Sequence, residues 1–205
     1  MLEPFIHGFI LALGLILPLG VQNVFVFNQG ALQPSYRRVL PVVITASLCD
    51  TLLILAAVLG VSLLILGSFW IKTILLMGGF IFLVYMGWNT WKSNPSNERK
   101  EMSVNFTFKK QVLFSASVSL LNPHAIMDTV GVIGTSSLNY QGEEKFIFAV
   151  ACILVSWIWF LGLSIIGRIS GKIDQSGNFL LFLNKISALV MWGAAVYLLL
   201  ALIKQ

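Results

Sequence analysis

Six long apolar stretches, separated by short polar segments, constrain this chain more than any other feature of its sequence. Each stretch is near or above the length of about 20 residues that an α-helix needs to cross a lipid bilayer. They cover residues 4–27, 39–66, 69–91, 111–136, 145–167 and 178–203. With 58% hydrophobic and only 10% charged residues, the chain cannot hide its apolar surface in a soluble core. The sequence therefore predicts an all-α integral membrane protein with six transmembrane helices.

The longest hydrophilic segment, residues 92–110, divides the six stretches into two groups of three. An odd number of spans in each group means that the second group enters the membrane from the opposite face. We therefore predict two inverted three-helix repeats, residues 1–91 and 111–205, joined by a cytoplasmic linker at 92–110.

Related residues recur at a nearly constant offset in the two groups. Pro18 and Asn23 correspond to Pro123 and Asp128, which lie 105 residues further along the chain. The segment LVYMG at 83–87 corresponds to LVMWG at 189–193, with an offset of 106. Chance similarity between leucine-rich segments is the alternative explanation. The repeat predicts that the two proline-broken helices, the first and the fourth, meet near the middle of the membrane.

Basic residues gather in the segments that follow the first, third and fifth stretches. They are Arg37, Arg38, Lys92, Arg99, Lys100, Lys109, Lys110, Arg168 and Lys172. Because positively charged loops stay in the cytoplasm, both termini are predicted to lie outside. This distribution explains the net charge of +5 better than nucleic-acid binding does, and we predict no nucleic-acid partner.

Two carboxylates lie inside the apolar stretches, Asp50 in the second and Asp128 in the fourth. An Asp near the middle of a transmembrane helix costs about 2.5–3.5 kcal/mol on insertion scales. The nearest basic residues within the stretches, Lys72 and Lys185, are near helix ends and are expected to extend to the interface. Two buried acids without a resident cation favour a mobile partner, such as a cationic substrate, protons, or both in turn. A purely architectural role for the acids remains the alternative.

The prolines at 18 and 123 are flanked by polar residues inside otherwise apolar stretches. Proline removes a backbone donor and breaks or kinks a helix, and broken helices beside buried acids are typical of transporter substrate sites. The neighbouring amides would then contact the amino and carboxylate groups of a substrate, and His124 would relay protons. Structural hydrogen bonds between helices are the alternative. The predicted substrate- and proton-binding residues are Gln22, Asn23, Asp50, Asn122, His124 and Asp128, with Pro18 and Pro123 as gating helix breaks.

Other chemistries find less support in the sequence. A transmembrane thiol-disulfide carrier would use Cys49 and Cys152, but no CxxC motif is present and inert buried thiols are favoured. Two Cys and two His scattered over different stretches have no metal-ligand spacing, so we predict no metal site, no cofactor and no enzymatic activity. A divalent-metal exporter would need more than two carboxylates at membrane depth.

Four segments resemble the LysE family of basic amino acid exporters: GLILPLGVQNVFVFNQG at 14–30, CDTLLI at 49–54, LNPHAIMDTVGVIG at 121–134 and VMWGAAVYLL at 190–199. The similarity extends over nearly the whole chain. Neutral amino acid exporters of the same superfamily tend to carry a PGP motif in the first span, whereas here Pro18 is followed by Leu19 and Gly20. The resemblance implies a bacterial inner-membrane protein that exports L-lysine or L-arginine with an ion gradient, and it implies functional roles for Asp50 and Asp128.

These observations together predict a secondary-active exporter of arginine or lysine. Proton antiport is the expected mechanism, with the two aspartates binding the substrate cation in one state and protons in the other. The expected partners are a basic amino acid, protons and the lipid bilayer, and homo-oligomerisation stays open. An exporter of neutral amino acids, or of another small metabolite or cation, is the alternative with the same fold.

Overall fold

The computed structural model describes residues 1–17, 20–60, 69–92, 107–120, 122, 125–126, 129–173 and 178–203. Within these residues all regular secondary structure is helical, and no β-strand occurs. The predicted all-α class is therefore confirmed for the described part of the chain.

Helices lie in each of the six apolar ranges. The first half of the chain contains α1 (Leu2–Ile16), α2 (Val21–Leu32), the 3-10 turn η1 (Tyr36–Arg38), α3 (Leu40–Val58) and α5 (Phe69–Lys92). The second half contains α7 (Phe108–Leu120), the π-helix η2 (Thr129–Gly134), the 3-10 turn η3 (Ser137–Asn139), α9 (Gly142–Ile173) and α10 (Asn178–Ile203). The first and fourth ranges each contain two helical pieces rather than one continuous helix.

Three helices of the described chain are long and apolar enough to cross a membrane: α3 with the turn before it, α9 and α10. The helices α1 and α2 meet the same requirement together, as one bent span whose halves are inclined by 79°. By length and composition the described residues therefore provide three membrane spans, or four when the bent pair counts as one.

The bend between α1 and α2 falls where the sequence predicts a break. Helical backbone angles extend to Leu17, and α2 begins after Gly20, whose backbone is extended (φ −77°, ψ 174°). Pro18 itself lies outside the described residues, as does Pro123 in the interval between α7 and η2. The described helix ends flank both predicted breaks, and the part that the prolines play stays a prediction.

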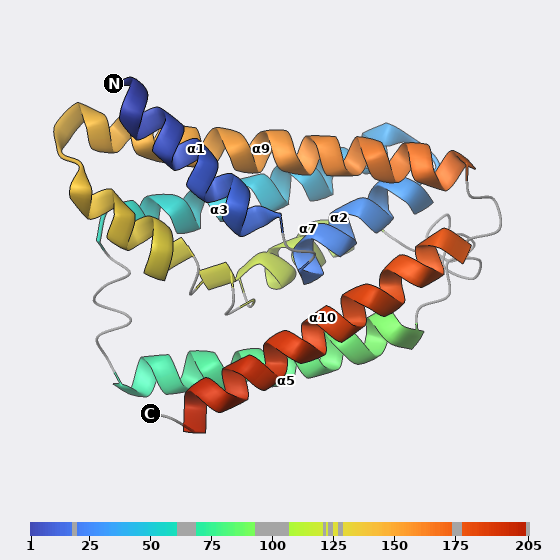
Figure 1. The fold of residues 1–205 in the computed structure, drawn as a ribbon. Coiled ribbons are helices and arrows are strands. Elements are labelled where there is room, and N and C mark those ends of the chain that lie inside the picture. Colours follow the sequence, from blue (N-terminus) through green and yellow to red (C-terminus); the bar gives the residue numbers. More distant parts are fainter. Residues whose placement is uncertain are drawn as a thin grey trace.

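The long helices run side by side across the molecule, and α5 and α10 form an antiparallel pair along one side of it (Figure 1). A buried apolar cluster joins this pair to the broken helices. It contains Val21 and Val24 of α2, Val118 of α7, Leu83 of α5 and Met191 of α10. On the other side α9 packs against α1, α2 and α3, so α2 lies between α9 and the α5–α10 pair.

The contact between α2 and α9 is made backbone to backbone. A Cβ atom at Gly30 would overlap the Ser164 carbonyl oxygen, and one at Gly167 would overlap the Phe27 carbonyl oxygen. Gly171 meets Ala31 in the same way. Small residues at such spacing allow close helix approach in membranes. A Cβ at Gly78 or Gly162, by contrast, would meet no described atom within 4 Å.

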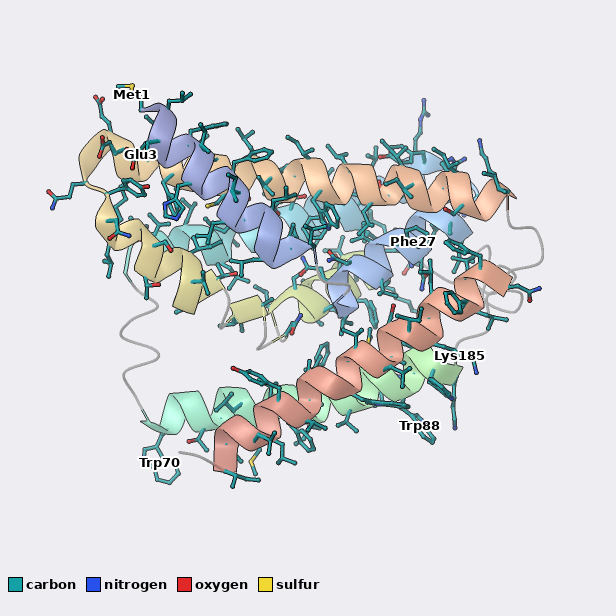
Figure 2. The ribbon with its side chains drawn as sticks, viewed as in Figure 1. Met1, Glu3, Phe27, Trp70, Trp88 and Lys185 are labelled. Atoms are coloured by element: carbon teal, nitrogen blue, oxygen red, sulfur yellow. The ribbon has the colours of Figure 1, made fainter. Side chains whose placement is uncertain are left out.

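Large apolar side chains cover much of the outer surface of the long helices. Exposed examples are Ile74, Met77 and Ile81 on α5, Ile158 and Ile165 on α9, and Leu189 and Val196 on α10. Trp70 and Trp88 lie toward opposite ends of α5 (Figure 2), as expected for tryptophan at membrane interfaces. Lys185 is exposed near the start of α10, with its Nζ atom 4.4 Å from the centre of the Trp91 ring. It therefore points to the surface, as predicted.

Candidate functional site

A cavity of about 160 Å³ lies where α1 and α2 meet. Its walls are mainly apolar, with a few polar side chains, which is the usual character of a small-molecule site. Four residues predicted from the sequence to bind substrate line it together: Gln22, Asn23, Asp50 and Asn122. Thr129 and Ser156 add two further hydroxyl groups, and the apolar lining includes Ile16, Ile54, Leu83, Phe160 and Met191.

Asp50, in the middle of α3, is held by two neutral donors. The Gln22 amide nitrogen Nε2 donates to Oδ1 at 3.0 Å, and the Ser156 hydroxyl donates to Oδ2 at 3.1 Å. Among the side chains that the structure describes, no Lys or Arg pairs with this carboxylate. Because a membrane-embedded charge is costly without a partner, Asp50 is equipped to bind either a proton or a visiting cation.

Ser156 is a site residue that the sequence analysis missed. It lies 106 residues after Asp50, the same offset that relates LVYMG to LVMWG. The next residues repeat this relationship, because the Trp157 indole nitrogen donates to the Thr51 hydroxyl at 3.1 Å, again across 106 positions. The offset that relates LVYMG to LVMWG also relates Asp50 to Ser156, but the sequence does not show that residues at this offset meet.

Asn23 bridges the bend rather than facing Asp50. Its Nδ2 atom donates to the Ile16 carbonyl oxygen at 2.6 Å, at the end of α1. Its Oδ1 atom accepts from the indole nitrogen of Trp159 on α9 at 3.2 Å. The amide thus satisfies a carbonyl at the end of α1 and connects the bend to α9, a structural role that accompanies its place in the cavity wall.

Asn122 has a different environment. Only 7% of its surface is exposed, and its Oδ1 atom has no hydrogen-bond donor among the described residues. A buried amide oxygen without a donor costs about 1–3 kcal/mol, so such an atom in a cavity wall points to a ligand or water as its partner. The buried Oδ1 atom of Asn122 therefore indicates, more directly than any other described atom of this site, that a hydrogen-bond donor is missing.

The fourth apolar range contributes a π-helix to the site. η2 begins at Thr129, which lines the cavity, and π-helical turns occur frequently at functional sites. The predicted site residues His124 and Asp128 lie outside the described residues, as do Pro18 and Pro123, the two predicted helix breaks. The structure therefore brings together one of the two predicted aspartates with the three predicted amides.

Buried amides also gather away from the cavity, toward the end of the molecule that carries Arg37, Arg38, Lys109, Lys110, Arg168 and Lys172, here called the basic end. Asn28 Nδ2 donates to Asn184 Oδ1 at 2.8 Å, linking α2 to α10. Gln111 on α7 donates to Gln29 Oε1 at 3.4 Å and to the Arg38 carbonyl oxygen at 3.0 Å. Gln33 Nε2 donates to Gln29 Oε1 at 3.0 Å. We call this set, Asn28, Gln29, Gln33, Gln111 and Asn184, the amide seam.

The amide seam lies between the cavity and the basic end. From Asn23 to Gln33 the chain advances ten residues, which corresponds to about 15 Å along a helix. The Phe25 and Phe114 rings meet in this interval, with centroids 4.6 Å apart.

The cysteines predicted for the alternative thiol chemistry are both free and buried. Cys152 lines the cavity and its Sγ atom lies 3.4 Å from the Gly8 carbonyl oxygen. No disulfide occurs between them in the structure. Their geometry adds no feature that a thiol-disulfide carrier requires.

The chain was compared with known proteins once this geometry had been established. A family model described as LysE type translocator matches residues 13–202. "Putative amino-acid transporter YisU" of Bacillus subtilis is 59% identical over 94% of this chain and 87% of its own length. The "Arginine exporter protein ArgO" of Salmonella paratyphi A is 31% identical over 97% of this chain and 94% of its own. That of Escherichia coli O157:H7 is 30% identical with the same coverage.

No solved structure matches the chain. The family match nevertheless covers almost the full length, and it includes the described cavity residues on α2, α3, α9 and α10. The resemblance noted from the sequence motifs is thereby confirmed, and the chain belongs to the LysE family of translocators, which are transporters rather than enzymes.

Proposed function

We propose that this protein exports basic L-amino acids, arginine or lysine, across the bacterial inner membrane in exchange for protons. The observation that carries the proposal is Asp50: a carboxylate at a membrane-embedded cavity, held by Gln22 and Ser156, with no cationic partner among the described side chains. The similarity to the arginine exporters ArgO supports arginine as the substrate.

Energetics favour coupling to protons. Moving one positive charge outward against an inside-negative potential costs about 2.3 kcal/mol per 100 mV. Exchange for a proton offsets this cost. Burial favours the neutral acid, whereas a bound guanidinium or ammonium group favours the carboxylate, so cation and proton exclude each other at Asp50. Asp128 is proposed as the second site of the same kind, and His124 as a proton relay.

The proposed architecture is six spans arranged as two inverted repeats, residues 1–91 and 111–205, with 92–110 as the cytoplasmic linker. Contacts between residues related by the repeat offset support it. Asp50 with Ser156 and Thr51 with Trp157 are two such pairs. The Trp192 indole nitrogen also lies 3.4 Å from the Val84 carbonyl oxygen, which joins the corresponding segments of α5 and α10. Contacts of this kind are expected near the axis that relates two inverted halves.

The positive-inside rule places the basic end in the cytoplasm and both termini outside. Substrate would then enter from the basic end, and the amide seam would open to admit it. Broken helices at Pro18 and Pro123 would supply the movement by which the cavity becomes accessible from each side in turn.

The proposal is tested with purified protein in liposomes. Labelled L-arginine, L-lysine and L-threonine are exchanged with and without an imposed pH gradient. We expect arginine or lysine exchange to exceed threonine exchange and to respond to the gradient. Threonine exchange above that of arginine and lysine would establish the neutral amino acid exporter instead.

Two variants test the aspartates directly. Asp50→Asn and Asp128→Asn are expected to lower exchange by about 30-fold or more while the protein still inserts, since removing a charge from a buried pair costs about 2–5 kcal/mol. Asp174→Asn, in the segment between α9 and α10, is the matched control and should keep wild-type exchange. Unchanged exchange by both cavity variants would remove the antiport mechanism.

A further inference from the structure

The first turn of α2 opens onto the cavity without a side-chain cap. Gly20 is the N-cap residue and makes no side-chain hydrogen bond, and the first bond within the helix runs from the Val24 nitrogen to the Gly20 carbonyl oxygen at 3.1 Å. The N–H groups of Val21 and Gln22 precede that bond and have no acceptor inside the helix. Gly20, Val21 and Gln22 all line the cavity.

This helix end has the electrostatic character of an anion site. The aligned peptide dipoles of a helix leave about half a positive charge at its N-terminus, and anions bind there to the free N–H groups. α2 has 12 residues, enough for its dipole to act over the first turn. In discontinuous membrane helices, such N-termini are used to hold anionic groups of substrates.

A second observation in the same cavity points independently to a ligand. Asn122 is more than nine-tenths buried, lines the cavity, and presents an Oδ1 atom with no donor among the described residues. An amide oxygen accepts hydrogen bonds, so its missing partner is a donor such as an ammonium group. An α-amino acid carries both kinds of group on its α-carbon: the ammonium group is a hydrogen-bond donor and the carboxylate is an anion.

The Gln22 side chain therefore connects two groups of opposite character at the cavity. The positive pole is the first turn of α2, which includes the backbone of Gln22. The negative pole is Asp50, which the Gln22 side chain reaches with its Nε2 atom. The two poles are therefore separated by at most the length of a Gln side chain and one hydrogen bond. The three or four methylene groups of Arg and Lys separate carboxylate and cation over a comparable distance.

We propose that the first turn of α2 binds the α-carboxylate of the substrate, with the α-ammonium group donating to Asn122 Oδ1 and the side-chain cation meeting Asp50. This assignment rests on the proposed function and deepens it. The protein would then require a free carboxylate and reject decarboxylated amines, even those with the same cationic side chain. Export would be restricted to amino acids rather than to cations in general.

Substrate analogues test the assignment in wild-type protein. Counterflow in liposomes is measured with L-arginine, with agmatine, which lacks the carboxylate, and with L-argininamide, which replaces it by a neutral amide. Loss of a hydrogen bond to a charged group is expected to lower exchange of both analogues by about tenfold or more relative to arginine. Exchange of agmatine as fast as arginine would overturn the assignment while leaving basic-cation export intact.

A variant should remove the preference for arginine over agmatine. A Cβ at Gly20 would meet no described atom within 4 Å, and the φ of −77° suits any residue. Gly20→Asp adds a carboxylate that caps the same N–H groups, and Asp is a favoured N-cap residue. It should occupy the subsite and lower the ratio of arginine to agmatine exchange about tenfold or more, so that arginine loses its advantage over agmatine. Gly20→Ala, which adds a methyl group without charge, should retain the wild-type preference.

The outcomes separate the two proposals. If L-threonine is exchanged and L-arginine is not, the basic-substrate function fails, and exchange of threonine but not of its decarboxylated amine still supports the carboxylate subsite. If the ratio of amino acid to decarboxylated amine exchange is equal in Gly20→Asp and Gly20→Ala, the carboxylate subsite is excluded, whichever amino acid is the substrate. Size-exclusion elution of each variant in detergent establishes that it is folded, and the wild-type analogue series decides the matter if Gly20→Asp elutes as aggregate.

Discussion

The two ends of α2 have contrasting surroundings within a single helix of 12 residues. Its first turn borders the cavity, where Gln22 holds Asp50 and the N-cap residue Gly20 makes no side-chain hydrogen bond. From Phe27 to Ala31 the same helix lies backbone to backbone against Gly167 and Gly171 of α9. One end presents groups that lack partners within the helix, and the other is so closely packed that a single methyl group would not fit.

This contrast indicates how the site is supported. A binding turn needs an element that holds it in place, and the α2–α9 contact provides one. On its other side α2 meets α7 and α10 through the side-chain hydrogen bonds of the amide seam, which are more easily exchanged for other partners than a backbone contact is. We therefore expect α2 and α9 to move as one unit and to separate from α7 and α10 when the basic end opens.

A substitution at the closely packed α2–α9 contact should have the largest effect, and this effect should be on the stability of the protein. Gly167→Ala places a Cβ against the Phe27 carbonyl oxygen and is expected to destabilise the protein by about 3 kcal/mol, the upper part of the range for overpacking. The loss of stability is measured by thermal unfolding in detergent. Gly162→Ala on the same helix meets no described atom within 4 Å and is the control. Equal melting temperatures for the two variants would show that the α2–α9 contact is not a rigid support.

The cavity end should respond in transport rather than in stability. Ser156→Ala removes the donor to Asp50 Oδ2, and a hydrogen bond to a charged group contributes about 1.5–3 kcal/mol. Arginine exchange in liposomes is expected to fall about tenfold or more. Ser170→Ala, further along α9 and away from the cavity, should exchange as the wild type does. A loss of melting temperature with unchanged exchange would assign Ser156 to packing alone.

The amide seam should show an intermediate effect. Gln111→Leu removes the bonds to Gln29 Oε1 and to the Arg38 carbonyl oxygen, at a cost of about 1–1.5 kcal/mol. Faster amide hydrogen exchange in α2 and α7 is the expected readout, because the seam closes the path from the basic end. Gln141→Leu, on an exposed residue before α9, serves as the control. Unchanged exchange rates in both helices would exclude the seam as the closing contact.

The smallest effect is expected at the bend. Trp159→Phe keeps the ring in place but removes the donor to Asn23 Oδ1, a neutral hydrogen bond of about 0.5–1 kcal/mol. Arginine exchange should fall about two- to fivefold as Asn23 gains freedom. Trp70→Phe, at the exposed far end of α5, is the comparison. A larger loss than in Ser156→Ala would show that the bend, and not Asp50, limits transport.

Parts of the site could be predicted from the sequence because they depend on local patterns. Asp50 and Gln22 stand out as polar residues in apolar stretches, and Pro18 predicts a break close to the bend between α1 and α2. Ser156 did not stand out, because a single serine in an apolar helix is common and its importance depends on the residue that it faces. Only the contact across 106 positions distinguishes it from Ser170 on the same helix.

The glycines illustrate the same limit. The residues Gly167 and Gly171 have the four-residue spacing of close-packing helices. Gly78 and Gly162 also lie in long apolar helices, but a Cβ at either would meet no described atom within 4 Å. A glycine permits close approach but does not specify which helix approaches. In this protein α2 meets the 167–171 face of α9, and the atoms that a Cβ would overlap all belong to another segment of chain.

The order of residues alone established the helical class, the apolar stretches, the family and the stranded carboxylate at Asp50, because each of these follows from hydrophobic length or from motifs that neighbouring residues share. The pairing of Gln22 and Ser156 with that carboxylate, the unpartnered oxygen of Asn122, and the uncapped turn of α2 at one cavity required the folded chain. Asp50 and Ser156 are 106 positions apart, whereas Asp50 and Gln22 are 28 positions apart. Helix packing, rather than local sequence preference, determines which of these residues meet.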